Sequence, residues 1–160
     1  FGGYPGDEDK ARAMFAAQDR AKMTDDLLNA VPYLRSRSDT TGKIGAVGFC
    51  YGGGVVNLMA VRIPDIAAAA PYYGAQPPVD QVPKIKAPLA IHYASEDPGI
   101  NKGADAYHAA LKANNAKFEP FTYPNTQHGF HNDTTPRYDD AAAKLSWQRT
   151  LALFNQYVKS

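Results

Sequence analysis

The chain has 160 residues, of which 44% are hydrophobic and 21% charged, a composition suited to a single globular domain. Its formal net charge is +1 and its Lys and Arg residues are scattered, so nothing favours nucleic acid or an anionic membrane as a partner. No apolar run is long enough to span a bilayer, and the glycine-rich, acidic first residues do not resemble a signal peptide. The single cysteine excludes an internal disulfide and a CxxC motif, and we expect a cytoplasmic protein.

The first 42 residues show helical patterns and no strand-like run. Phe1–Asp7, with three glycines and a proline, is expected to be an irregular loop. The acids Asp7-Glu8-Asp9 precede apolar residues at helical spacing and predict a short helix, because carboxylates favour a helix N-terminus. Thr24 is predicted to cap a second helix, which Pro32 should kink or break.

Apolar runs alternate with helical patterns from residue 43 onward. Strands are predicted at Lys43–Phe49, Ile66–Ala70, Leu89–Tyr93 and Phe118–Tyr123. Helices are predicted at Val55–Val61, Asn101–Asn115 and Ala141–Val158. The last helix should have an apolar face of Leu145, Leu151, Leu153 and Phe154. The proline-rich stretch Gln76–Lys86 is predicted to be a surface loop. The alternation predicts an α/β fold with a mostly parallel, doubly wound sheet and helices on both faces.

Cys50 follows the first predicted strand within Gly48-Phe49-Cys50-Tyr51-Gly52. Small neighbours allow a nucleophile to occupy a sharp strand-to-helix turn, where the helix dipole favours the thiolate. The backbone N–H of Tyr51 would then be one oxyanion donor. Taken alone, such a cysteine is more often a small buried apolar residue. The segment fits neither a GxGxxG dinucleotide loop nor a Walker phosphate loop, which disfavours a cofactor-dependent oxidoreductase.

Asp97 and His128 lie after the third and fourth predicted strands. The carboxyl ends of parallel strands meet at one edge of a sheet, and the order nucleophile, acid, histidine is that of α/β-hydrolases. His128 would therefore be the general base for Cys50, and Asp97 would orient its imidazole. Asp97 also fits a simple Asx-turn, with Glu96 as its nearest competitor, and His131 is the rival of His128. No histidine pair has the HExxH spacing of a zinc site.

These segments resemble the dienelactone hydrolase family. The resemblance is carried by Gly48-Phe49-Cys50-Tyr51-Gly52-Gly53, Pro71-Tyr72-Tyr73-Gly74, Glu96-Asp97-Pro98 and His128-Gly129-Phe130, and it covers nearly the whole chain. It implies an α/β-hydrolase fold and a cofactor-free enzyme that cleaves a small-molecule ester or lactone. The reaction would use a triad of Cys50, His128 and Asp97 and a thioacyl intermediate. We also expect a compact, partly aromatic pocket lined by Tyr51, Tyr72, Tyr73 and Phe130.

The sequence departs from the family at two places. Members that act on a carboxylated lactone bind its carboxylate with arginines, one of them shortly after the histidine, whereas here the first arginine after His128 is Arg137. An esterase or lactonase of broader specificity is therefore at least as well supported as an enzyme for the carboxylated lactone.

The second departure concerns the sheet. Family members carry further strands before the nucleophile strand, a loop with the second oxyanion donor, and a glutamate that partners the thiol. Here no strand is predicted before Lys43–Phe49, although this run is apolar on both faces, as is typical of a central strand. We therefore expect residues 1–160 to be the C-terminal portion of one α/β-hydrolase domain. A missing N-terminal segment or a second chain would complete the sheet.

Two alternatives to an active hydrolase stay open. The chain could be a non-catalytic hydrolase-fold binding module, or a fragment that is inert without its oxyanion loop. A redox-sensing thiol is the other alternative. An ordinary thiol pKa of about 8.5 would argue against an activated nucleophile.

Overall fold

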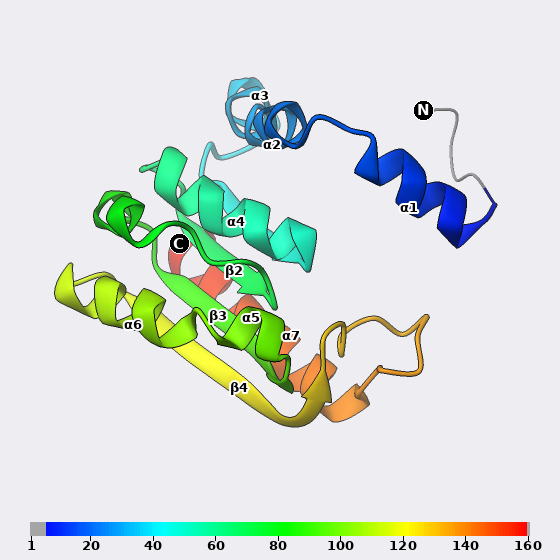
Figure 1. Ribbon diagram of the computed structural model, residues 1–160. Helices are drawn as coiled ribbons and strands as arrows, with labels where there is room; N and C mark the ends of the chain where they lie inside the picture. Colours follow the sequence, from blue (N-terminus) through cyan, green and yellow to red (C-terminus); the bar gives the residue numbers. More distant parts are fainter. Residues whose placement is uncertain (1–5, 160) are drawn as a thin grey trace.

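The four predicted strands form one parallel sheet in the computed structural model, which describes residues 6–159 (Figure 1). The strands are β1 (Gly45–Phe49), β2 (Ala68–Tyr72), β3 (Leu89–Glu96) and β4 (Phe118–Gln127), and they lie in the order β1-β2-β3-β4. Every neighbouring pair is parallel. Because all four strands run in the same direction, their carboxyl ends lie at the same edge of the sheet. The first five residues of the loop expected at Phe1–Asp7 lie outside the described residues.

Helices cover both faces of the sheet, as predicted (Figure 1). On one face, α4 (Tyr51–Arg62) packs on β1 and β2, and α6 (Ala104–Ala113) shares its core. On the other face, α7 (Asp140–Tyr157) packs against β2, β3 and β4. Buried aliphatic side chains dominate the first core, whereas the second core contains the aromatic residues Tyr72, Tyr73, Tyr123 and Phe130.

The N-terminal helices are α1 (Glu8–Ala16), α2 (Arg20–Leu28) and α3 (Ala30–Ser36). Asp7 caps α1, as expected from the acids that open it. The prediction that Thr24 caps a helix is wrong, because the side chain of Asp19 accepts the first free N–H groups of α2. The predicted break near Pro32 occurs at Asn29, so Pro32 falls in the first turn of α3, where a missing N–H leaves no hydrogen bond unmade.

Two predicted segments differ in detail from the structure. Gln76–Lys86 is not only a surface loop, because it contains the 3₁₀ helix η1 (Val79–Lys84), whose Val82 is buried in the core. The single helix expected at Asn101–Asn115 is divided into α5 (Pro98–Asn101) and α6.

The buried face of α7 also differs from the prediction. Leu145 and Leu151 are each 43% exposed, while Leu153 and Phe154 pack only partly against the core. The buried positions are Ala142, Ala143, Ser146 and Thr150. Ser146 and Thr150 can be buried because their hydroxyl groups are hydrogen-bonded, to the carbonyl of Ala143 and to the Tyr72 hydroxyl respectively.

The strand β1 lies at an edge of the sheet within residues 6–159, although its sequence predicts a central strand. Its side chains Val47 and Phe49 are each 36% exposed. An apolar strand at an open edge is unusual in a folded protein, because unpaired N–H and C=O groups invite pairing with another strand.

Candidate active site

Cys50 occupies the tight turn between β1 and α4. Its backbone has φ 56° and ψ −118°, which residues other than glycine rarely adopt. Its N–H donates to the carbonyl of Tyr72 at 3.1 Å, which ties the turn to the end of β2. A Cβ at Gly48 would lie 2.2 Å from the carbonyl oxygen of Gly52, so only glycine fits there. The turn therefore leaves the thiol exposed at the N-terminus of α4, as the sequence predicts.

Asp97 and His128 meet at the same edge of the sheet. Asp97 follows β3 and is 8% exposed, and its Oδ1 accepts the N–H of Ile100 at 3.3 Å, which fixes the carboxylate. Its Oδ2 lies 2.6 Å from His128 Nδ1, which donates to it. The competitors Glu96 and His131 take no part in this pair.

The Cys50 thiol and the His128 imidazole shift each other's pKa. Their hydrogen bond is the largest influence on both groups. It lowers the pKa of the Cys50 thiol below its ordinary value, against burial, which raises it. It also raises the pKa of His128 from 6.5 to about 9, with a further contribution from the hydrogen bond to Asp97 and opposition from burial. Each shift favours the charged form of its group, which is the thiolate of Cys50 and the imidazolium of His128.

The backbone N–H of Tyr51 faces the Cys50 sulfur, whereas its ring contacts the N-terminal helices. A hydrogen bond from its backbone lowers the pKa of Cys50, so the N–H lies next to the sulfur, where an oxyanion donor is needed. The ring does not line the pocket as expected. It packs edge-on against Phe15 with a centroid distance of 5.2 Å, and its hydroxyl lies 3.3 Å from Thr24 Oγ1.

A pocket of about 410 Å³ opens in front of the thiol. It is lined by Phe49, Cys50, Tyr73, His128, Gly129, His131, Asn132, Asp133 and Arg137. The loop after His128 therefore supplies much of one wall. Sequence reasoning identified Cys50, His128 and Tyr73 in this set, and it missed Phe49 and most of the loop.

The structure places two of the predicted pocket residues elsewhere. Tyr72 and Phe130 are fully buried and belong to the core between the sheet and α7, so the expectation that they line the pocket is wrong. The Tyr72 hydroxyl is paired with Thr150 at 2.7 Å. Its ring lies 4.5 Å from that of Phe49, so Tyr72 supports the pocket wall from below.

Arg137 is brought back to the pocket by the loop that follows β4. The N–H of Asp139 donates to the carbonyl of Phe130 at 2.9 Å and closes this loop. Gly129 has φ 91°, and the Arg137 guanidinium passes beside it, with Nε 3.6 Å from the position that a Cβ would take. Arg137 thus lines the pocket although it is nine residues from His128 in the sequence.

His92 and His108 are hydrogen-bonded to residues other than Cys50. His92 is fully buried, and its two ring nitrogens pair with Tyr123 Oη at 2.9 Å and Thr150 Oγ1 at 3.1 Å. Burial lowers the pKa of His92 to about 3, so it stays neutral. His108 lies in α6 and contacts the Tyr93 hydroxyl.

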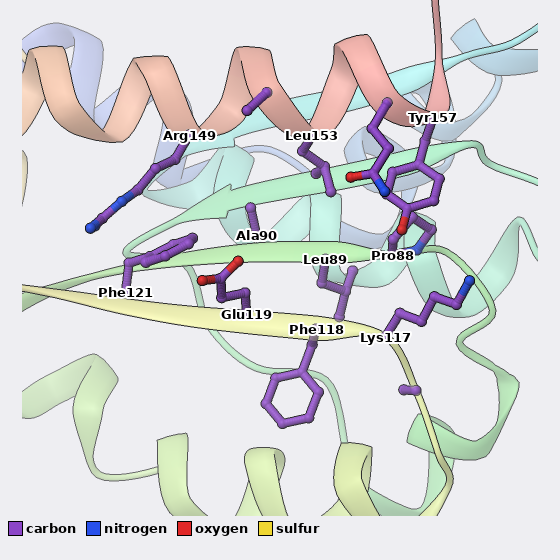
Figure 2. Close-up of a pocket in the computed structure, with 13 residues that line it drawn as sticks. Pro88, Leu89, Ala90, Lys117, Phe118, Glu119, Phe121, Arg149, Leu153 and Tyr157 are labelled. Carbon is purple, nitrogen blue, oxygen red and sulfur yellow. The ribbon is translucent and has the colours of Figure 1, made fainter. Parts of the chain in front are cut away.

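A second groove, of about 610 Å³, lies between β4 and α7 (Figure 2). Arg149 and Tyr157 of α7 reach towards the strand, and the Arg149 guanidinium lies 4.1 Å from the centroid of the Phe121 ring (Figure 2). Its lining residues include no cysteine and no histidine, in contrast to those of the Cys50 pocket. Within residues 6–159, no group of three His, Cys, Asp or Glu side chains could hold a metal ion. No helix of this part of the chain is long and apolar enough to cross a membrane.

Solved structures share this architecture. A provisionally named dienelactone hydrolase of Klebsiella pneumoniae is 30% identical, with a TM-score of 0.78 over 86% of this chain and 62% of that chain. A dienelactone hydrolase-like promiscuous phosphotriesterase from metagenomic libraries has a TM-score of 0.77 at 19% identity, over 94% of this chain and 66% of that chain. The second likeness concerns the fold alone.

Sequence relatives agree with these structures. A provisionally named carboxymethylenebutenolidase of Salmonella typhi is 36% identical over 69% of this chain and 45% of the relative. One of Saccharolobus solfataricus is 32% identical over 86% of this chain and 53% of the relative. The chain thus spans about half the length of these curated relatives. A sequence model of the dienelactone hydrolase family matches residues 2–158. With a parallel sheet that brings Cys50, Asp97 and His128 to one edge and a match along almost its whole length, the chain belongs to the dienelactone hydrolase family.

Proposed function

We propose that this chain carries the nucleophile, base and orienting acid of a hydrolase that cleaves small carboxylic esters or lactones. The observation that carries the proposal is the connected set of Cys50, His128 and Asp97, in which the thiol pKa is lowered and the His128–Asp97 contact is 2.6 Å. A buried structural cysteine would instead have a raised pKa and no histidine partner.

In the proposed acylation, the Cys50 thiolate attacks the carbonyl carbon of the ester, and the carbonyl oxygen becomes an oxyanion that accepts the N–H of Tyr51. The tetrahedral adduct then collapses. The bond to the alkoxide leaving group breaks, and the His128 imidazolium donates its proton to that alkoxide. The products of this half-reaction are an alcohol and a thioacyl enzyme.

Deacylation reverses the proton movement. Neutral His128 removes a proton from water, and the water oxygen attacks the thioester carbon. Collapse of the second adduct releases the carboxylic acid and returns the sulfur to the thiolate, while the proton remains on His128. Asp97 accepts the Nδ1–H throughout, which keeps Nε2 directed at the sulfur and at the water.

The pocket favours substrates that carry an acidic group. Arg137 has no carboxylate within ion-pair distance among the described residues, although it lines the pocket with Cys50. A guanidinium offers two parallel N–H donors to a carboxylate, which would orient such a substrate over the thiol. The substrate class that we propose is therefore a small ester or lactone with a negatively charged substituent.

We further propose that strands outside these 160 residues pair with β1 in the working enzyme. The open apolar edge of β1 and the greater length of the relatives support this proposal. Such a segment, in the same chain or in a second one, would also supply a second oxyanion donor beside Tyr51.

The test uses Cys50→Ala and Cys50→Ser, with p-nitrophenyl esters and small lactones as substrates. Cys50→Ala should lower kcat/KM on the order of a thousandfold or more, and mass spectrometry of the wild-type chain should show an acyl group on Cys50. The assay is run on this chain and on a version extended at its N-terminus. Wild-type turnover by Cys50→Ala would overturn the proposal. Turnover by the extended version alone would show that the 160 residues are inert by themselves.

A further inference from the structure

We propose that Tyr73 is a positioning residue that holds the His128 imidazole against the Cys50 thiol. The inference rests on the proposed function of the same site. Tyr73 directly follows β2, and it lines the same pocket as Cys50 and His128.

The backbone of Tyr73 is held in an uncommon conformation. Its φ is 34°, in the left-handed region that residues other than glycine usually avoid. Its N–H donates to the carbonyl of His92 at 2.7 Å. A Cβ at Gly53 would lie 2.4 Å from the Tyr72 carbonyl, and one at Gly74 would lie 2.2 Å from the carbonyl carbon of Gly53, so α4 packs directly on this segment. Uncommon backbone conformations persist where the surroundings enforce them, and they gather at functional sites.

The ring of Tyr73 packs on His128. The ring centroids are 4.9 Å apart with an interplanar angle of 55°, and no other aromatic ring contacts His128 among residues 6–159. On its other side, Tyr73 meets the ring of Phe130 edge-on at 5.4 Å. The imidazole is therefore held by two neighbours, the tilted ring of Tyr73 and the Asp97 carboxylate at Nδ1.

The hydroxyl of Tyr73 connects the same side chain to the loop beyond the base. Burial and the nearby Cys50 raise the pKa of Tyr73, so the hydroxyl stays protonated, while a hydrogen bond from the backbone of His131 lowers this pKa and thus places the start of that loop next to the hydroxyl. Tyr73 is only 3% exposed, which leaves little of its surface for a substrate. One side chain thus contacts the base through its ring and holds the following loop through its hydroxyl.

Two substitutions separate these contacts. Tyr73→Leu removes the ring and the hydroxyl, whereas Tyr73→Phe removes only the hydroxyl and is nearly isosteric. The measurement is the rate of alkylation of Cys50 by iodoacetamide as a function of pH, which follows the thiolate fraction and needs no substrate. If Tyr73 holds His128 in place, its loss should weaken the effect of His128 on the thiol and raise the thiol pKa. The midpoint of the pH profile of alkylation should then rise by about one pH unit in Tyr73→Leu and by about a third of that in Tyr73→Phe.

Tyr107 offers a matched control, because it is a fully buried tyrosine of the core beneath α6 whose hydroxyl bonds Asn57. Tyr107→Leu and Tyr107→Phe should lower the unfolding temperature and leave the alkylation midpoint unchanged. Unchanged midpoints in both Tyr73 variants would overturn the proposal. If Tyr73→Leu does not fold, an unchanged midpoint in Tyr73→Phe alone would overturn it. A wild-type midpoint at the ordinary thiol value would instead contradict the proposed function itself.

Discussion

At the scale of single residues, the pocket contains two separate features, the Cys50–His128 pair and the Arg137 guanidinium. Cys50 and His128 shift each other's pKa towards their charged forms, and Asp97 pairs with Nδ1 of His128. Arg137 lies at the same pocket but has no ion pair among the described residues, so its charge is available to a ligand. Reactivity and substrate preference should therefore respond to different substitutions.

Arg137→Gln should raise KM for an ester that carries a carboxylate by about tenfold, because a charge-assisted hydrogen bond contributes roughly 1.5 kcal/mol or more. A neutral ester of the same shape should keep its KM. Arg62→Gln is the control, because it removes the same charge from an exposed ion pair with Asp25. Steady-state kinetics on the ester pair provides the measurement, and an equal loss on both esters would assign Arg137 to structure rather than to anion binding.

At the scale of elements, the close contact between α4 and β2 fixes the turn that carries Cys50. The sequence draws attention to several glycines after Cys50, but they are not equivalent. A Cβ at Gly53 would lie 2.4 Å from the Tyr72 carbonyl oxygen, whereas a Cβ at Gly52 would have nothing within 4 Å. Of these two glycines, only Gly53 is required for the close approach of α4 to the end of β2.

Gly53→Ala should therefore lower the free energy of unfolding by about 1–3 kcal/mol, as expected when a packed contact is overfilled. Gly52→Ala should be neutral or stabilising by up to about 1 kcal/mol, because alanine favours a helix where space allows. Urea unfolding of both variants measures the difference. Equal stability of the two variants would show that α4 can shift away from β2 at little cost.

The sequence predicted elements well where local pattern determines them. The four strands and the order of Cys50, Asp97 and His128 were found because strand periodicity and the turn at each strand end are local features. Tyr72 and Tyr73 could not be told apart, since they are neighbours at a strand end. One faces α7 and the other the pocket, and the φ of 34° at Tyr73 depends on packing with Gly53 and Gly74.

Contacts between distant residues explain the other misses. Arg137 returns to the pocket through a backbone hydrogen bond between Asp139 and Phe130, which no spacing rule indicates. The buried face of α7 was misassigned because Thr150 is polar, yet it bonds Tyr72 and His92 in the core. In both cases tertiary hydrogen bonds override the local pattern.

At the scale of the whole molecule, the open edge of β1 is the feature that most affects behaviour in solution. Val47 and Phe49 are partly exposed on a strand whose outer N–H and C=O groups have no strand partner among residues 6–159. Such an edge is a template for pairing with another strand. The 160-residue chain should therefore self-associate more readily than a version with further strands beside β1.

Val47→Lys should reduce this association, because a charge at an edge strand opposes pairing. Its effect on the stability of the 160-residue chain should stay within about 0.5 kcal/mol. In an extended chain whose added strands cover β1, the same lysine should cost about 2 kcal/mol or more, since it would be buried. Light scattering measures the association and urea unfolding measures the stability. Val79→Lys is the control, because Val79 is an exposed residue of η1. Equal scattering by the Val47 and Val79 variants would count against association through β1.

The closed loop after β4 has a consequence for how this protein can diversify. The hydrogen bond between Asp139 and Phe130 separates His128, which precedes it, from the stretch 131–138, which includes Arg137. Substitutions within this stretch that leave the hydrogen bond intact should therefore alter the wall of the pocket more than the placement of Cys50, Asp97 and His128. If the proposed function holds, a preference for new substrates can arise here without a change in the proposed triad.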